Sequence, residues 1–377
     1  MRIAINCRVL IPNRLEGIGW YIYETTKRMI ENHPEDTFIL LYDRKNDHTF
    51  FPQKNAIELY IPPMARHPIL YRLWFDYMIP WKLKKHSPDV FVSMDGMNSG
   101  RLKVPSYLMI HDLAYLHYPQ YIDAIHLAFY EKNTPRFISN ADGLGTVSNY
   151  SRSDLAKNFN LNPENIDVIP NGCRPVFRKL SADEKREVRQ SLGIKKPYFI
   201  YTGSIHPRKN CVNLIRAYNH FRFRSPLEHE LVIVGRMAWM NDLFERELEN
   251  SPFKKQIHLT GYVGDEKLAG LLGAAEALVY PSLFEGFGVP LLEAMNAEVP
   301  IITSKNSSLP EVAGEAAVLV DPKNPQDIGR AMQTLAKNQP LRKKLIDAGI
   351  KRRKMYHWDK SAKMLYSAIK RTAHKQR

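Results

Sequence analysis

The sequence predicts an α/β protein built from two doubly wound, Rossmann-like domains. Apolar runs typical of parallel strands buried on both faces alternate with amphipathic helical patterns, and the alternation occurs in two separate series. The chain also has 377 residues, which is too many for one ordinary hydrophobic core. Ligands of such open sheets bind beyond the carboxyl ends of the strands, so we expect the two domains to face a central cleft that holds the site.

The two series place the predicted elements. The first series predicts strands within 2–11, 37–42, 89–95 and 105–112, and helices over 17–32 and 124–141. The second predicts strands within 196–204, 229–236, 257–262, 275–282 and 299–304, and helices over 211–223, 265–275 and 289–297.

A polar segment separates the two series. Segment 170–197 has prolines near each end and is typical of a linker with one short helix. We therefore expect the boundary near residue 177, with a first domain over 1–177 and a second domain over 178–358. A last helix, about 359–377, carries one apolar face, and the first domain is a candidate surface for it to pack on.

The composition is that of a globular protein of a reducing compartment. Hydrophobic residues make up 44% of the chain and charged residues 25%. Cys7, Cys173 and Cys211 lie far apart and lack the spacing of metal ligands. Neither a signal peptide nor a run of about 18 apolar residues is apparent, so we expect a cytoplasmic location.

Positive charge is concentrated near the C-terminus. The formal charge is +15, and residues 337–377 hold fourteen Lys and Arg against two Asp. Such a segment suits an anionic membrane surface or a nucleic acid, and a solvated helical face is the alternative. No RNA-recognition or helix-turn-helix signature accompanies the charge, so nucleic acid is not an expected partner.

A second segment, 71–86, mixes Lys and Arg with aromatic residues that include Tyr71, Trp74, Phe75 and Trp81. This mixture favours either peripheral attachment to the inner face of a membrane or a core helix whose polar side is basic.

Two cations follow the first predicted strand of the second domain. Gly203 and Ser204 make a tight exit from the strand, and Arg208 and Lys209 come just before the next helix. Cations at a helix N-terminus add to its partial positive charge and exposed N–H groups, which suits a diphosphate. A solvated basic turn is the alternative.

The stretch EGFGVPLLEAM holds two carboxylates around a glycine turn. Gly286 and Gly288 allow close approach of a ligand to the backbone, and Pro290 marks a helix start. We expect Glu285 to hold sugar hydroxyls from the loop, and Glu293 to accept hydrogen bonds from a ribose from the first helical turn. The alternative is that Glu293 complements the helix dipole and Glu285 is an ordinary loop residue.

The first domain offers weaker signals. Gly17 and Gly19 open a helix after the first strand, as in a phosphate-binding turn, although a lone G-x-G is weak. His111 and Asp112 end a later strand and are expected to face the cleft; a structural histidine is the alternative. No D-x-D occurs that would carry a divalent metal, so no metal is expected.

Together these residues resemble the retaining glycosyltransferases of family 4, which have the GT-B fold. The strongest element is the E-x7-E pattern from Glu285 to Glu293. Other family stretches match in the expected order: YTGSIHPRKN, TVSNYSRSDL and VIPNGCRPVF. The resemblance covers nearly the whole chain.

The resemblance implies a nucleotide-sugar donor bound mainly by the second domain, over 178–358, and an acceptor bound by the first, over 1–177. Glu293 would hold the ribose and Glu285 the donor sugar, while Arg208 and Lys209 would neutralise the diphosphate. The remaining contacts would come from Gly286, Phe287, Gly288 and Val289 to the sugar and phosphates, Tyr262 and Val263 to the base, His111 to the transferred sugar, and Gly17 or Gly19 to the phosphates.

One position departs from the family. Many members carry Arg directly after the glycine equivalent to Gly203, and this chain has Ser204 there. Arg208 and Lys209 then carry more of the fixed positive charge.

The implied reaction transfers a hexose such as mannose or glucose to a hydroxyl of a glycan or lipid-linked saccharide, with retention of configuration and without a cofactor, in cell-surface polysaccharide biosynthesis. No enzymic nucleophile is evident, so front-face attack is expected. The alternatives are another GT-B enzyme, such as a nucleotide-sugar epimerase or a phosphorylase, and a basic nucleic-acid-binding protein. The base, the sugar and the acceptor stay open.

Overall fold

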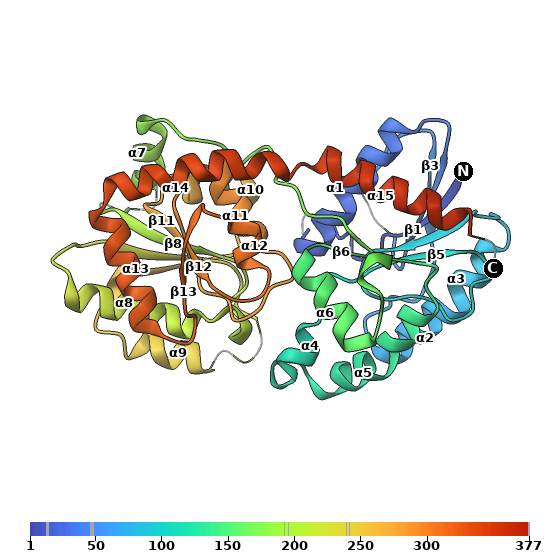
Figure 1. Cartoon of the computed structure of the whole chain (residues 1–377), viewed down its shortest axis with the longest axis horizontal. Helices are drawn as coiled ribbons and strands as arrows, with labels where there is room; N and C mark the ends of the chain where they lie inside the picture. Colours follow the sequence, from blue (N-terminus) through green and yellow to red (C-terminus); the bar gives the residue numbers. More distant parts are fainter. Residues whose placement is uncertain are drawn as a thin grey trace. The chain divides into compact units, whose positions relative to one another are not determined.

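The chain folds into two compact units. The computed structural model describes residues 1–12, 15–45, 49–191, 193–194, 196–238, 240 and 242–375, so Arg377 of the basic segment lies outside the described residues. The first unit comprises Met1–Asn171 and the C-terminal segment from Trp358, and the second comprises Gly172–His357. Figure 1 shows sheet and helices in each unit.

Unit 1 is a seven-stranded parallel sheet with helices between the strands. The strand order is β3-β2-β1-β4-β5-β6-β7, so the order reverses between β1 and β4. The strands are β1 (Arg2–Asn6), β2 (Thr37–Tyr42), β3 (Ala56–Tyr60), β4 (Val90–Ser93), β5 (Ser106–Met109), β6 (Gly143–Thr146) and β7 (Ile166–Val168). The longer helices are α1 (Gly17–Asn32), α5 (Ala124–Ser139), α6 (Asn149–Phe159) and α15 (Trp358–Ala373), with shorter ones at α2 (Pro68–Leu73), α3 (Ile79–Leu83) and α4 (Ala114–His117).

Unit 2 is a six-stranded parallel sheet that is doubly wound, as in unit 1. The order β10-β9-β8-β11-β12-β13 reverses between β8 and β11. The strands are β8 (Tyr198–Thr202), β9 (Glu230–Val234), β10 (Ile257–Gly261), β11 (Ala277–Tyr280), β12 (Ile301–Ser304) and β13 (Ala317–Val320). The helices are α7 (Ala182–Ser191), α8 (Cys211–Arg224), α9 (Asp242–Glu249), α10 (Asp265–Gly273), α11 (Val289–Asn296), α12 (Leu309–Ala313), α13 (Pro325–Lys337) and α14 (Gln339–Arg352).

The predicted α/β class with two doubly wound sheets is confirmed. The central strands β1, β4, β5, β8 and β11 are buried almost throughout, as strands covered on both faces must be. Four strands are not among those predicted from the sequence. The edge strands β3 and β13 are partly exposed, and β3 is interrupted by Glu58 whereas β13 is the short apolar run AVLV. Strand β6 is the glycine-rich GLGT, and β7 has only three residues.

The C-terminal helix α15 belongs to unit 1, where it packs along α1 (Figure 1). The Trp358 ring meets the Tyr21 ring edge-on, with centroids 5.9 Å apart. Ser361 Oγ donates to the carbonyl oxygen of Pro170 at 2.6 Å, and Arg28 Nε donates to Asp359 at 2.6 Å. The apolar face that the sequence left without a partner is therefore buried within unit 1.

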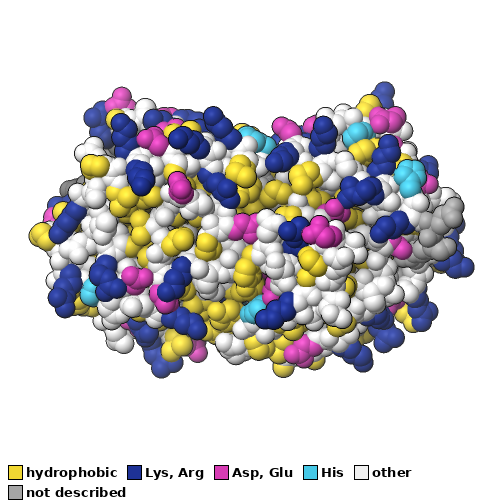
Figure 2. Space-filling view, viewed as in Figure 1, with side chains coloured by type: hydrophobic (Ala, Val, Ile, Leu, Met, Phe, Trp, Pro, Cys, Tyr) yellow, Lys and Arg dark blue, Asp and Glu magenta, His cyan; other side chains and the backbone are white. Residues whose placement is uncertain are grey.

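The basic C-terminal region is packed helix rather than a free tail. Several of its cations are bound at helix ends and in ion pairs: Arg342 to Glu276 at 2.5 Å, Arg353 to the carbonyl oxygen of Asn296 at 3.1 Å, and Arg371 to Asp167 at 2.6 Å. In Figure 2, Lys and Arg side chains are interspersed with Asp and Glu on the visible face. These three arginines thus have structural contacts, whereas the lysines of the region that the structure describes are exposed.

Candidate active site in the second unit

Loops converge at the point in unit 2 where the strand order reverses. β8 and β11 are neighbours there, and the chain leaving each strand at its carboxyl end carries predicted site residues. Asn210, which has a left-handed backbone (φ +65°), joins these loops. Its Nδ2 donates to the carbonyl oxygens of Pro281 at 2.9 Å and Pro322 at 2.7 Å, which follow β11 and β13.

Glu285 lies at the centre of a buried network in this position. Its Oε1 accepts hydrogen bonds from Lys209 Nζ (2.6 Å), Ser282 Oγ (2.6 Å) and Tyr280 Oη (2.8 Å). Its Oε2 faces Arg208 Nη1 at 3.4 Å. The two predicted cations and the predicted loop carboxylate are therefore brought together, and the surface-turn alternative does not describe them.

The electrostatics of this network keep Glu285 ionised. Burial alone would raise the pKa of the carboxyl, but Lys209, Arg208 and the hydrogen bond from Ser282 lower it to about 2. The neighbouring Tyr280 hydroxyl has a raised pKa, because it is buried beside that negative charge. The result is a fixed carboxylate between two cations, a preorganised charge pattern of the kind that stabilises charge developing in a transition state.

The turn between Glu285 and α11 has a strained backbone that only glycine fits. Gly288 has φ +104° and is the N-cap of α11, and a Cβ there would lie 2.6 Å from a methyl of Leu309. Ser308 Oγ donates to the carbonyl oxygens of Glu285 (2.8 Å) and Phe287 (3.0 Å), while the Phe287 ring is buried against Tyr356. Gly286 is buried in the same turn.

The expectation that Glu293 lies in the first helical turn is wrong. α11 begins at Val289, one residue before Pro290, and its first turn contains no acidic residue. Glu293 follows in the second turn, with its side chain only 6% exposed. A simple interaction with the helix dipole therefore does not explain this carboxylate, because the dipole effect fades within the first turn.

Arg174 is the partner that the sequence did not reveal for Glu293. Its Nη2 donates to Glu293 Oε1 at 2.7 Å, and its Nη1 donates to Asp265, the first residue of α10. The guanidinium also lies over the Phe177 ring, 4.9 Å from the centroid. Arg174 lies in the family-like stretch VIPNGCRPVF, but that stretch does not say which carboxylate the arginine binds, so only the structure identifies the pairing.

The turn after β8 is shaped by backbone contact with the loop after β9. Gly203 has φ +138°, and a Cβ on Gly235 (φ +150°) would lie 1.8 Å from the Gly203 carbonyl oxygen. Only glycine at position 235 allows this approach. Ser204, the departure from the family pattern, uses its carbonyl oxygen to accept a hydrogen bond from Tyr201 Oη at 3.0 Å.

Tyr262 and Val263 form the turn between β10 and α10. Tyr262 is 54% exposed, so its ring is available at the surface of unit 2. Asp265 follows closely in the chain, and the contact of Arg174 with both Asp265 and Glu293 therefore connects this turn to α11.

The predicted residues of unit 1 gather after β1 and β5. His111 Nε2 lies 2.8 Å from the carbonyl oxygen of Met94, so Nε2 carries the hydrogen, and the ring meets Tyr21 edge-on at 5.0 Å. Burial lowers the pKa of His111, which favours the neutral ring. Asp112 caps the next turn by accepting from the Ala114 N–H at 3.0 Å. Gly17 and Gly19 lie in the first turn of α1, and a Cβ on Gly17 would meet no atom within 4 Å.

Segment 71–86 combines both sequence interpretations. Tyr71, Trp74 and Phe75 belong to the core of unit 1, so these three aromatic side chains are not available to a membrane, whereas Tyr77 is 43% exposed. Trp81, in contrast, is 62% exposed. None of the helices in the described part of the chain combines the length and apolarity that crossing a bilayer requires.

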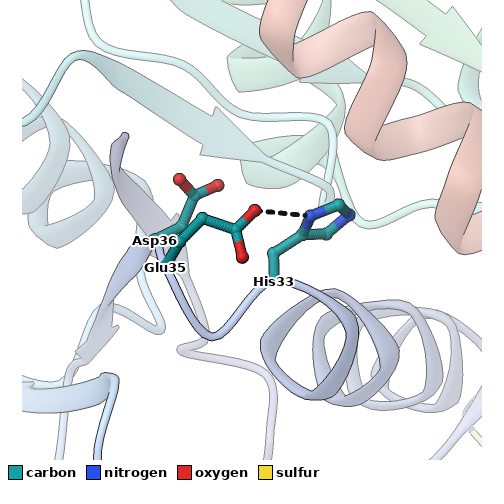
Figure 3. A group of neighbouring side chains, drawn as sticks. All are labelled: His33, Glu35 and Asp36. Atoms are coloured by element: carbon teal, nitrogen blue, oxygen red, sulfur yellow. Dashed lines mark hydrogen bonds and ion pairs between the residues drawn. The ribbon is translucent and has the colours of Figure 1, made fainter.

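Figure 3 shows the group in the described residues whose atoms are close enough to share a metal ion: His33, Glu35 and Asp36. It lies in unit 1, where His33 Nδ1 is 3.1 Å from Glu35 Oε1. Asp36 Oδ2 accepts from Tyr366 Oη at 2.6 Å, and the His33 ring stacks on Tyr366 at 3.5 Å. These side chains therefore join the end of α1 to α15 and are not part of the candidate active site.

Two doubly wound units, with a carboxylate held between cations at the strand-order reversal of the second, are the arrangement expected of sugar-transferring enzymes with the GT-B fold. Two family models match the chain, "Glycosyl transferases group 1" over residues 184–352 and "Glycosyltransferase Family 4" over residues 15–176. The chain belongs to this glycosyltransferase family.

Curated and solved relatives agree with that placement. The O-antigen chain mannosyltransferase B of Escherichia coli is 28% identical over 371 residues, covering 94% of this chain and 96% of that protein. The sucrose-phosphate synthase of Thermosynechococcus elongatus has a TM-score of 0.79 at 16% identity, covering 98% of both chains. Anabaena HepE, solved with UDP-glucose, has a TM-score of 0.76 at 15% identity, covering 98% of this chain and 100% of that one. These solved structures support the fold.

Proposed function

We propose that this glycosyltransferase moves a mannosyl or similar hexosyl group from a nucleotide sugar to a hydroxyl of a glycan or lipid-linked saccharide, during assembly of a cell-surface polysaccharide. The observation that carries the proposal is the network in which Lys209 and Arg208 surround Glu285 at the strand-order reversal of unit 2. Mannose is the first choice of sugar because the E. coli relative is named a mannosyltransferase and matches along nearly its whole length.

The charges suit the separation of a sugar from a diphosphate. As the bond from the anomeric carbon to the phosphate oxygen breaks, negative charge develops on the diphosphate and positive character on the sugar ring. Arg208 and Lys209 would stabilise the departing diphosphate, and Glu285 would orient the sugar through its hydroxyls. Removing one such preorganised donor typically costs roughly 2.7–4 kcal/mol of transition-state stabilisation.

We propose retention of configuration by front-face attack. The acceptor oxygen forms its bond to the anomeric carbon on the face from which the diphosphate leaves, and the hydroxyl proton passes to the departing phosphate oxygen. Glu285 is a poor candidate for a covalent nucleophile, because Oε1 already accepts three hydrogen bonds and Oε2 faces Arg208. The side chains of Arg208 and Lys209 can supply the positive charge that a metal ion supplies in other transferases, so we propose that the reaction is metal-independent.

We assign binding of the acceptor to unit 1, and we propose that the enzyme acts at the inner face of a membrane. Ile69 on α2 is 72% exposed and Trp81 on α3 is 62% exposed, and the basic side chains of Arg72, Lys84 and Lys85 are exposed beside them. Such a mixture suits insertion of apolar side chains among anionic headgroups. Flotation with vesicles containing an anionic lipid should show salt-sensitive binding that Trp81→Ser weakens; binding equal to that of neutral vesicles would contradict this part of the proposal.

A donor screen tests the central proposal. Thermal shift with GDP-, UDP-, ADP- and dTDP-sugars should show stabilisation by one nucleotide class, as expected when a ligand binds the folded state. NMR of the product made from that donor and a saccharide acceptor should show an α-linkage from an α-linked donor. Inversion would exclude the retaining mechanism, and conversion of the donor without any acceptor would instead indicate an epimerase.

A further inference from the structure

We propose that Arg174 is a positioning residue of the donor site: it fixes Glu293 through one carboxylate oxygen and leaves the other oxygen to accept hydrogen bonds from the donor's ribose. The inference rests on the proposed function, because it names how that site holds its nucleotide. The stretch VIPNGCRPVF contains Arg174, but the sequence revealed neither of its contacts, with Glu293 and with Asp265.

The geometry brings three separate segments of unit 2 together at one guanidinium. Arg174 follows the first residues of the unit, Asp265 begins α10, and Glu293 lies on α11. Nη2 meets Glu293 Oε1 at 2.7 Å while Nη1 binds Asp265, so the planar group spans two carboxylates at once. Arginine's fixed fork is suited to this, and the point charge of lysine reproduces it only in part.

The contact leaves the two oxygens of Glu293 unequal. Oε1 is bound to Arg174, and within the described residues no group donates a hydrogen bond to Oε2. Glu293 is 5% exposed, so a carboxylate there needs its partner in order to stay charged. A ribose diol offers the two hydroxyl donors that an unbound carboxylate oxygen can accept.

Charged and titratable groups around Glu293 come from several elements. Burial raises the pKa of Glu293, Arg174 opposes that rise, and Asp265 adds to it. The Cys173 thiol and the Tyr280 hydroxyl also interact electrostatically with Glu293, and Arg353 binds the carbonyl oxygens at the far end of α11. Among these, Arg174 is the group that lowers the pKa, so its removal should make Glu293 protonate at a higher pH.

The same contact has two rival explanations. Arg174 could serve only to hold the linker against α10 through Asp265. In that case its loss would lower the free energy of unfolding without changing the affinity for nucleotide. It could also occupy the ribose position and exclude the nucleotide, in which case its loss tightens binding. The positioning role predicts weaker binding, with a changed pH dependence.

The test measures binding of GDP and UDP to the full chain by calorimetry from pH 6 to pH 8.5. For whichever nucleotide the wild type binds, Arg174→Gln should weaken affinity about 10- to 100-fold, the range expected for a hydrogen bond to a charged group. The loss should be greatest at low pH and shrink as the pH rises. Arg174→Lys should recover part of the affinity.

Two further variants separate the explanations. Arg342→Gln removes a partly buried ion pair with Glu276, which precedes β11 at the opposite edge of the sheet, and should bind nucleotide like the wild type. Adding Arg174→Gln to Glu293→Gln should cost no further affinity, because the two residues act through one contact.

Each outcome bears on one conclusion. Unchanged or tighter nucleotide binding by Arg174→Gln, or the same loss in the Glu293→Gln background, would overturn the positioning role while leaving the proposed function intact. A wild-type protein that binds neither nucleotide nor any nucleotide sugar would instead overturn the proposed function itself.

Discussion

Replacing Glu285 by glutamine should destabilise unit 2 in a way that depends on pH. The substitution keeps the size of the side chain but removes a charge that Lys209 and Arg208 surround. Their attraction, with the hydrogen bond from Ser282, lowers the pKa of the carboxyl from 4.5 to about 2. The folded state therefore binds the charged form more tightly than the unfolded chain does.

The size of the effect follows from that pKa difference. The two values correspond to about 3 kcal/mol of stability, and the side chain is only 9% exposed, so little of this is lost to solvent screening. Because the folded pKa is depressed, the contribution is fully present above pH 4.5 and is lost as the pH falls toward 2. It should be roughly halved near pH 3.

Thermal unfolding of the two proteins at several pH values provides the measurement. For a unit of this size, about 3 kcal/mol corresponds to a lowering of the midpoint by roughly 6–12 °C at neutral pH. The difference should narrow as the pH is lowered. Glu298→Gln is the matched control, since its partner Lys179 is 70% exposed and such surface pairs contribute about 0–1 kcal/mol. An equally stable or more stable Glu285→Gln variant at neutral pH would refute the reasoning.

Three other predictions concern the turnover of a Lys209 variant, the stability of a Gly288 variant and the effect of metal removal on the transfer rate. Lys209→Met should lower kcat about 10²- to 10³-fold with little change in KM for the donor, and steady-state kinetics showing only a raised KM would contradict this. Gly288→Ala should destabilise unit 2 by about 1–3 kcal/mol in thermal unfolding, because its φ of +104° is strained for alanine and the new methyl would contact Leu309. Exhaustive treatment with EDTA should leave the transfer rate unchanged, and recovery of a lost rate by Mg²⁺ or Mn²⁺ would show that a metal takes part.

The fold was largely predictable because its central strands are mostly apolar. Burial on both faces makes β8 and β11 runs of aliphatic and aromatic residues, with Thr202 at the end of β8, and the helices between strands keep their period. The predicted range 17–32 coincides with α1. The edge strand β3 was not predicted because one of its faces is exposed to solvent, so its apolar run is interrupted by the charged residue Glu58.

The candidate site was predictable where it is carried by local motifs, and unpredictable where it depends on distant contacts. Arg208, Lys209 and Glu285 were found because each follows a strand end, although only the structure shows that they meet. Tyr280 reads as the last apolar residue of a strand, yet its hydroxyl donates to Glu285. Arg174 lies 119 residues from Glu293 in the chain, and one sequence holds no signal that pairs them.

The placement of α15 makes the second unit an insertion within the first. Unit 2 is one continuous stretch, Gly172–His357, whereas unit 1 needs both the N-terminal stretch and the last helix. A fragment ending at Asn171 would therefore expose the side of α1 that Trp358 and its neighbours cover. We expect such a fragment to aggregate, because that surface is apolar. The stretch from Gly172 to His357, in contrast, carries Arg174, Lys209, Glu285 and Glu293 together. A truncated protein made of this stretch is therefore the suitable fragment for studying nucleotide binding by unit 2 alone.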